Sequence, residues 1–275
     1  MIQLFRVLRS ALLVMALMPS VALAQSEAPA PPDTRSTPIP ERVFDLPLAN
    51  GERQTVLYAA PSHPRATIVM LPGGAGDVGV EGDGTLRHGD NFVVRTRALW
   101  VAKGYTVLIP DTVDRTNLRG LRSSSEYANL VEALIGFAHA QAVAPVFLLG
   151  TSQGSIAAMN GAAHAPAGAL AGIVLTESVS RMGGSHETVF DAYPADVRVP
   201  ALVVANRDDR CDVAPPQDAA RIAGAMTRSP DVHVLDVAGG VTSSKNDCGS
   251  LSPHGYYGIE AKVIDAIGRW LDAHI

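Results

Sequence analysis

The stretch Pro145-Val-Phe-Leu-Leu-Gly150-Thr-Ser152-Gln-Gly154 decides how this chain is expected to fold. Its first half is a continuous apolar run, which is typical of a strand buried on both faces of a sheet. Gly150 and Gly154 flank Ser152 with the spacing of a tight strand-to-helix turn, where larger side chains would clash. A segment of small residues follows. The stretch therefore predicts a strand, a sharp turn that exposes the serine hydroxyl, and a helix that follows the turn. The alternative, a glycine-rich loop with an incidental serine, does not account for the strand and the helix.

On both sides of this stretch, short apolar runs alternate with segments of helical pattern. The apolar runs predict strands at 43–48, 55–58, 66–71, 105–109, 146–149, 172–175, 201–205 and 232–237. The helical patterns cover 92–103, 125–141, 156–163, 216–226 and 259–273. Such alternation predicts an α/β fold with a mostly parallel central sheet and helices on both faces.

A candidate catalytic set accompanies the turn. A serine hydroxyl is a poor nucleophile until a base removes its proton, and a carboxylate must orient that base. After such a turn, the acid is expected beyond a later strand and the histidine before the last helix. Asp208, Asp209 and Asp212 follow the strand at 201–205, and His254 precedes the final helix. We predict Ser152 as nucleophile and His254 as base, because the other histidines lie within predicted elements or at the wrong point in this order.

The glycine-rich segment Leu71-Pro-Gly-Gly74-Ala-Gly76 directly follows the strand at 66–71. Acyl transfer places negative charge on a carbonyl oxygen, and backbone N–H groups can stabilise that charge where the chain approaches closely. We predict that the amides of Gly74 and Gln153 form this oxyanion hole. A phosphate-binding loop is the competing interpretation, but no Gly-Lys-Ser/Thr follows and the spacing is not Gly-x-Gly-x-x-Gly.

The N-terminus predicts export. Arg6 and Arg9 precede an apolar run at 11–18, and the small residues Ala22 and Ala24 predict a signal peptide over 1–24 that is cleaved after Ala24. A membrane anchor is the alternative, but the run is shorter than the ~20 residues that span a bilayer. Residues 25–42 are rich in proline and alanine and predict a disordered leader. The folded domain is then expected at 43–275, in a secreted or periplasmic protein.

The net charge and the cysteine content limit the classes of partner and of site that the sequence allows. The net charge of −5 becomes −7 without Arg6 and Arg9, and no basic run remains, which argues against nucleic acid and anionic membranes as partners. Cys211 and Cys248 are the two cysteines. Behind a signal peptide they predict a disulfide bond, with two free thiols as the alternative. Neither Cys-x-x-Cys nor His-x-x-x-His occurs, so we expect no zinc site. The predicted serine mechanism needs neither a metal nor an organic cofactor.

The chain resembles the α/β-hydrolase family over roughly 43–273, and especially a branch of small secreted bacterial hydrolases with one disulfide near the active site. The matching stretches are 71–76, 91–95, 150–155, 175–179, 208–211 and 248–260. The resemblance implies that Asp209, two residues before the first cysteine, is the acid, with Asp208 and then Asp212 as fallbacks. The resemblance also implies the Ser-His-Asp triad, whereas members of the family differ in substrate. We therefore expect a serine hydrolase, and carboxylic esters of small molecules, cleaved through an acyl-serine intermediate, are our predicted substrates. A peptidase or acyltransferase with the same triad, and a non-catalytic binding protein, remain alternatives.

The length of one connection limits the architecture further. Two predicted strands already occupy the interval between Ser152 and Asp209, and only about 178–198 is left free. We therefore expect a short flap there and no large cap domain.

Overall fold

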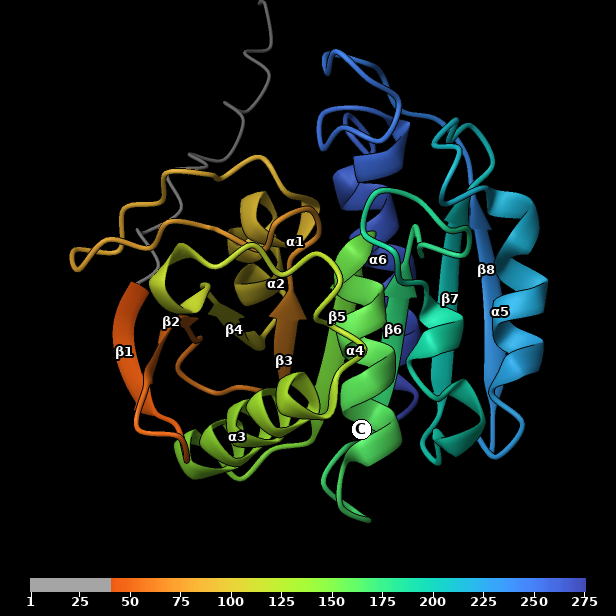
Figure 1. The fold of residues 1–275 in the computed structure, drawn as a ribbon. Coiled ribbons are helices and arrows are strands. Elements are labelled where there is room, and N and C mark those ends of the chain that lie inside the picture. The colour runs from red at the N-terminus through yellow and green to blue at the C-terminus, as the bar shows by residue number, and fades with distance from the viewer. Residues whose placement is uncertain (1–40) are drawn as a thin grey trace, which may run out of the picture. The chain divides into compact units, whose positions relative to one another are not determined.

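A single sheet with the strand order β1-β2-β4-β3-β5-β6-β7-β8 organises the protein in the computed structural model, which describes residues 41–275 (Figure 1). β1 and β2 pair antiparallel, β2 also pairs antiparallel with β4, and the remaining pairs are parallel. The strands are β1 (Glu41–Pro47), β2 (Arg53–Ala59), β3 (Ala66–Leu71), β4 (Tyr105–Pro110), β5 (Val146–Thr151), β6 (Gly172–Thr176), β7 (Ala201–Asn206) and β8 (Val232–Val237). The predicted signal peptide and nearly all of the predicted leader lie outside the described residues.

Continuous burial of the central strands explains their sequences. Every residue of β3, β4, β5, β6 and β7 is buried, so these strands have no solvent-facing side on which polar residues would alternate. β8 forms an edge of the sheet and is correspondingly more exposed, with His233 and Asp236 on its surface. Because β3, β5, β6, β7 and β8 run parallel, their carboxyl ends lie along one edge of the sheet. The candidate site residues follow the strands at this edge.

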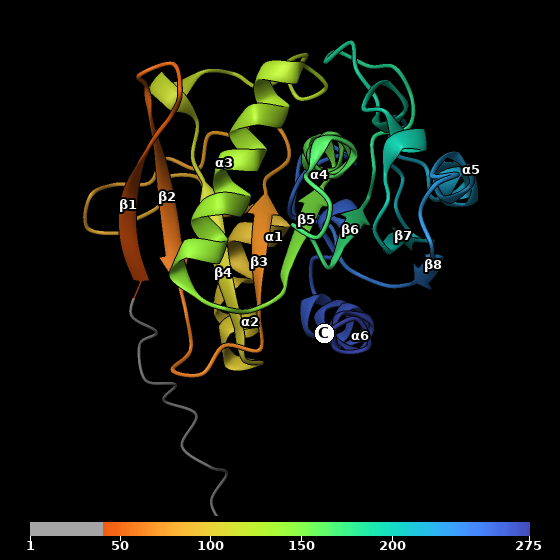
Figure 2. The ribbon, with the colours of Figure 1, turned by 90° about the horizontal axis from the view of Figure 1, so that it is seen from below.

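Helices cover both faces of the sheet (Figure 2). One face packs against α3 (Ser125–Gln141), α4 (Gln153–His164) and α5 (Ala219–Ala225), and the other against α1 (Phe92–Arg95), α2 (Arg97–Ala102) and α6 (Glu260–Asp272). Each face has its own apolar core. The mostly parallel sheet with helices on both faces confirms the predicted fold class.

Two predicted helices differ from the observed ones. The helix expected at 92–103 is divided at Thr96, whose hydroxyl donates to the carbonyl of Phe92 at 2.6 Å and whose ψ is 0°. A threonine hydroxyl that bonds the preceding turn competes with the helical backbone, which accounts for the break. The helix expected at 216–226 begins with a 3-10 turn, Pro216–Asp218, before α5.

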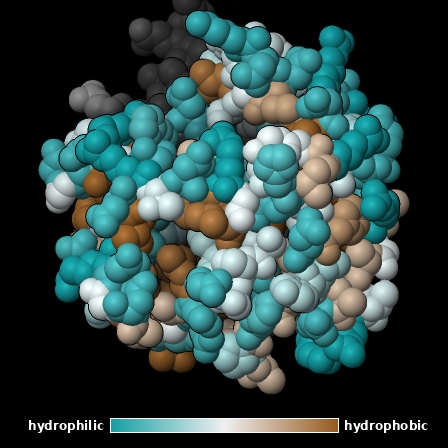
Figure 3. Space-filling model, viewed as in Figure 1, coloured by the Kyte–Doolittle hydropathy of each residue, from teal (hydrophilic) through white to brown (hydrophobic). Residues whose placement is uncertain are grey.

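The connection between β6 and β7 contains no large cap domain, as predicted. It holds two short 3-10 turns, Val189–Asp191 and Pro194–Asp196, and it is packed onto the domain by Val179, Val189 and Val197, which are fully buried. The surface shown in Figure 3 is mostly hydrophilic, with hydrophobic residues in separate groups. Within residues 41–275, no helix has both the length and the apolar character needed to cross a bilayer.

Candidate active site

Ser152 lies on the sharp turn between β5 and α4. Its φ of +53° and ψ of −122° are unfavourable for a residue with a side chain, and such strain is concentrated at functional sites. The turn is held by a hydrogen bond from the Ser152 amide to the carbonyl of Thr176, at 2.9 Å. A β-carbon at Gly150 would overlap the carbonyl of Gly154, and one at Gly154 would overlap that of Leu71. The two glycines are therefore required by close backbone approach.

His254 lies on a 3-10 turn, Pro253–Gly255, in the loop that leads from β8 to α6. The hydroxyl of Ser252 accepts a hydrogen bond from the His254 amide at 3.2 Å. Arg95, at the end of α1, also holds this loop. Its guanidinium donates hydrogen bonds to the carbonyls of Ser250 and Gly255 and forms an ion pair with Glu260 at 3.0 Å. Helix α1 thus positions the histidine loop from a distant part of the sequence.

A continuous hydrogen-bonded chain joins Ser152, His254 and Asp209. Nδ1 of His254 lies 2.8 Å from Oδ2 of Asp209, and Nε2 lies 2.9 Å from Oγ of Ser152. The Asp209 side chain is fully buried and that of His254 is 4% exposed. An ionised carboxylate only accepts hydrogen bonds, so Nδ1 carries the proton and Nε2 presents its lone pair to the serine hydroxyl. This arrangement lets the imidazole take a proton from Ser152.

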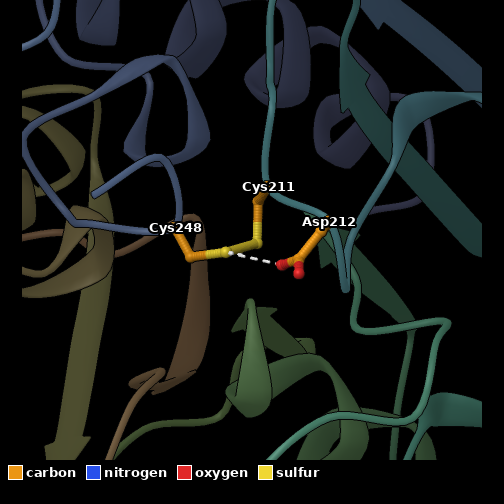
Figure 4. A group of neighbouring side chains, drawn as sticks. All are labelled: Cys211, Asp212 and Cys248. Atoms are coloured by element: carbon orange, nitrogen blue, oxygen red, sulfur yellow. Dashed lines mark hydrogen bonds between the residues drawn. A yellow bond between two sulfur atoms is a disulfide. The ribbon is translucent and has the colours of Figure 1, made fainter.

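The other two candidate aspartates have different partners. Oδ2 of Asp208 accepts from the amide of Gly239 at 2.6 Å. The carboxylate of Asp212 lies beside the disulfide, with Oδ1 3.6 Å from Sγ of Cys248 (Figure 4). Asp209 is thus the member of this trio that contacts His254, and its Oδ1 accepts from the amide of Cys211 at 2.8 Å.

The predicted disulfide is present. Cys211 and Cys248 are bonded, with their α-carbons 4.6 Å apart (Figure 4). Cys211 follows β7 within the loop of Asp209, and Cys248 follows β8 within the loop of His254. The bond therefore ties the acid loop to the histidine loop across the edge of the sheet.

The two predicted oxyanion donors lie beside Ser152. A β-carbon at Gly73 would come within 3.0 Å of Cβ of Ser152, so the glycine-rich loop runs directly against the turn. Gly74 has a φ of +61°, and Gln153 is the first residue of α4. Among the described residues, neither the Gly74 nor the Gln153 amide donates a hydrogen bond to any protein atom. Both N–H groups are thus available to a ligand oxygen.

These residues line a cavity of about 550 Å³. Apolar contacts come from Val78, Phe92 and Val213, but charged and polar side chains make up much of the wall: Asp77, Arg87, His88, Asp90, Asn91, Arg119 and Asn246. One wall is the loop after β3, which Asp111 anchors by accepting from the amides of Val78 at 2.9 Å and Val80 at 2.7 Å. The resulting site is moderate in size and largely polar.

Sequence reasoning missed Glu177, which is 1% exposed and lies directly behind Asp209. Ligand atoms of Glu177, Asp209 and His254 all lie within 4.8 Å of one another, a spacing that a metal ion could use. Here, however, the Asp209 and His254 atoms bond each other at 2.8 Å. The available sequence signal was an acidic residue directly after the strand next to β5, at the edge of the sheet where Ser152 lies.

No family model and no curated protein sequence matches the chain. Solved structures do. A cold-adapted esterase from an Arctic intertidal metagenomic library is 17% identical with a TM-score of 0.57, and 84% of this chain covers 95% of that one. The dienelactone hydrolase of Anabaena variabilis is 13% identical with a TM-score of 0.56, at 84% and 95% coverage. The acylaminoacyl peptidase of Pyrococcus horikoshii is 10% identical with a TM-score of 0.57, and 85% of this chain covers 41% of that protein.

These three proteins share a fold with this chain at low sequence identity, and they differ in the reaction that each is named for. The arrangement of the sheet agrees with the resemblance seen in the sequence. So do the strand-to-helix turn at Ser152 and the position of the Asp209 and His254 loops at the same edge of the sheet. The chain has the α/β-hydrolase fold.

Proposed function

We propose that this protein is a serine hydrolase that cleaves carboxylic esters through an acyl-serine intermediate. The observation that carries the proposal is the hydrogen-bonded chain from Asp209 through His254 to Ser152, with distances of 2.8 and 2.9 Å. A serine in strained backbone, aligned with a neutral imidazole whose other nitrogen is held by a buried carboxylate, is the arrangement that activates a hydroxyl for acyl transfer.

The residues take separate roles in the reaction. Oγ of Ser152 attacks the carbonyl carbon of the ester while its proton passes to Nε2 of His254, and Asp209 stabilises the imidazolium that forms. The carbonyl oxygen becomes negative and receives hydrogen bonds from the amides of Gly74 and Gln153. His254 then gives its proton to the departing alcohol. In the second half, a water attacks the acyl carbon while Nε2 of His254 takes its proton. The carboxylic acid product then leaves as His254 returns that proton to Oγ of Ser152.

The cavity supports small, polar esters as substrates. Its volume is about 550 Å³, and its wall carries Asp77, Arg87 and Arg119 rather than a continuous apolar surface. Long acyl chains would leave these charged groups poorly solvated. The absence of a large cap over the described domain also disfavours a lipase that opens at a lipid interface. We expect short acyl groups to be hydrolysed faster than long ones.

We also propose that the protein is exported. Its support is the signal-peptide pattern over residues 1–24 and the Cys211–Cys248 disulfide, which is a bond typical of proteins in oxidising compartments.

A covalent probe tests the proposed function. The purified protein is treated with a fluorophosphonate and digested, and mass spectrometry should find the label on Ser152 and none in Ser152→Ala. Turnover of a series of p-nitrophenyl acyl esters is then compared with that of aminoacyl p-nitroanilides. Faster cleavage of the anilides would favour the peptidase alternative. Failure of the probe to label Ser152, with no turnover of either series, would favour a non-catalytic binding protein.

A further inference from the structure

A buried glutamate lies behind the candidate triad. Glu177 immediately follows β6 and has a φ of +44°, a left-handed conformation that is rare for a residue with a side chain. Its amide donates to the carbonyl of Val204 on the neighbouring strand at 3.1 Å. The carbonyl of the preceding residue, Thr176, accepts a hydrogen bond from the amide of Ser152. The strained backbone thus connects the nucleophile turn to a carboxyl group that has no access to water.

The two oxygens of this carboxyl differ in their surroundings. Oε1 of Glu177 accepts a hydrogen bond from the amide of Asn206 at 2.8 Å. Oε2 is buried and, among the described residues, receives no hydrogen bond from any donor. A charged oxygen left in this way would be strongly disfavoured. The neighbouring carboxyl belongs to Asp209, which has an oxygen within 4.8 Å of one of Glu177. Two carboxyl groups can form a hydrogen bond to each other only when one of them carries a proton.

The other ionisable groups around Glu177 are His254 and Tyr256. His254 is already bonded to Asp209, and the phenol of Tyr256 donates to the carbonyl of Val204 at 3.2 Å. Among the described residues, no lysine or arginine forms an ion pair with Glu177. Burial, followed by the negative charge of Asp209 and a hydrogen bond with it, raises the pKa of Glu177 well above its ordinary range, and the nearby Tyr256 phenol and Asn206 amide oppose this increase only in part. Burial raises the pKa of Tyr256 well above its ordinary value as well.

We propose that Glu177 is protonated at neutral pH and donates its proton, from Oε2, in a hydrogen bond to Asp209. The candidate triad is thereby extended to a chain of four residues, Glu177–Asp209–His254–Ser152. Glu177 is a positioning residue in this chain, because it acts on the reaction only through Asp209. This inference depends on the proposed serine-hydrolase function for its catalytic meaning, but the protonation state can be measured without any substrate.

The shared proton has a chemical purpose. Two carboxylates behind His254 would hold the imidazole in its protonated form and prevent it from acting as a base. A neutral Glu177 leaves a single negative charge behind His254, on Asp209. Its O–H group also donates a hydrogen bond that fixes the orientation of the Asp209 carboxylate. Asp209 then has three donors: the amide of Cys211, Nδ1 of His254 and the carboxyl of Glu177. The proton remains on Glu177 throughout the reaction, so no step gains or loses a proton there.

The protonation state is tested by infrared difference spectroscopy at pH 7. The spectrum of the wild-type protein minus that of Glu177→Gln should contain the carbonyl stretch of a protonated carboxylic acid. Glu187→Gln is the matched control, because Glu187 is also buried but accepts from the Gly120 and Ser123 amides and from the Ser123 hydroxyl, which suit a carboxylate. A carboxylate band in the Glu177 difference spectrum would overturn the proposal, whether or not the protein hydrolyses esters.

The positioning role is tested by the titration of His254, followed by NMR of the imidazole and by the pH profile of kcat/KM. Glu177→Gln keeps a neutral donor, so the titration midpoint should move by less than about 0.3 pH units. Loss of an ionised glutamate at this distance would instead lower the midpoint by about one to three units, which would overturn the proposal. Glu177→Leu removes the donor and should lower kcat about tenfold relative to Glu177→Gln with little change in KM. Equal kcat values for these two variants would also contradict it.

Discussion

At the scale of single residues, neighbouring aspartates in one loop have separate tasks because their side chains meet different partners. Asp209 is directed at His254, Asp208 at the amide of Gly239, and Asp212 at the disulfide. The two adjacent residues Asp208 and Asp209 therefore provide a matched pair of variants, equal in charge and close in position.

We expect Asp209→Asn to lower kcat by about four orders of magnitude, because the amide favours the wrong imidazole tautomer. Asp208→Asn changes a hydrogen bond to Gly239 and should lower kcat only a few-fold. Steady-state kinetics with a p-nitrophenyl ester, together with circular dichroism to check folding, would measure both. Similar, mild losses in the two variants would mean that neither aspartate is the acid.

Glu177 should also make stability depend on pH. Its folded-state pKa is raised above the ordinary value of about 4.3, so the stability it contributes is fully present below that pH and is lost as the pH rises toward the folded-state pKa. The free energy of unfolding of the wild type, relative to Glu177→Gln, should fall by about 1.4 kcal/mol per pH unit above pH ~4.3. Urea unfolding of both proteins from pH 4 to 8 would measure this difference. A difference that does not vary with pH would show that Glu177 is ionised in the native state.

At the scale of structural elements, the site is assembled by contacts between loops that follow separate strands. The acid loop follows β7, the histidine loop follows β8, and Ser152 follows β5. The Cys211–Cys248 disulfide joins the acid loop to the histidine loop. Hydrogen bonds from Arg95 on α1 hold the histidine loop in addition.

Removing the disulfide should affect both stability and catalysis. The bond closes a loop of 37 residues, and loop-closure entropy suggests a contribution of roughly 3 to 4 kcal/mol. The double variant Cys211→Ala/Cys248→Ala should therefore have a lower Tm, and its kcat should fall as Asp209 and His254 lose their fixed separation. Calorimetry and ester kinetics would measure the two effects, with Asp212→Asn as a control that leaves the bond intact. An unchanged kcat would show that the loops are held in place without the bond.

Arg95 should act through the histidine loop. Arg95→Ala removes the hydrogen bonds to the carbonyls of Ser250 and Gly255 and the ion pair with Glu260. A displacement of His254 by about 1 Å can lower kcat on the order of a hundredfold. Arg97→Ala is the control, since Arg97 lies in the next helix and pairs with Glu41, away from this loop. A loss of activity that is equal in the two variants would assign the effect to general destabilisation.

At the scale of the whole molecule, an apolar core lies on each face of the sheet, and the site lies at the edge where six parallel strands end. The proposed export bears on the same architecture, because a disulfide like the one across the site is typical of proteins in oxidising compartments. We expect the exported protein to begin at Gln25, which N-terminal sequencing would establish. A mature protein that retains Arg6 and Arg9 would contradict cleavage after Ala24.

Much of the fold follows from local patterns along the chain. Apolar runs along the sequence predicted each of the eight strands. The runs of β3 to β7 are continuous, since a strand buried on both faces needs apolar residues throughout. The break at Thr96 was not predicted, because threonine occurs in helices as well and only its bond to the carbonyl of Phe92 interrupts this one.

The sequence by itself determined the strand-to-helix turn at Ser152, because the glycines around it report a steric requirement within a few residues of chain. It also determined the order of nucleophile, acidic loop and histidine. The residues alone left Asp208, Asp209 and Asp212 open as partners of His254, and the family resemblance favoured Asp209. Only the tertiary structure decided which carboxylate meets the imidazole and placed Glu177 behind it. Those contacts join loops after β6, β7 and β8, and their distances depend on strand order and register rather than on any local pattern.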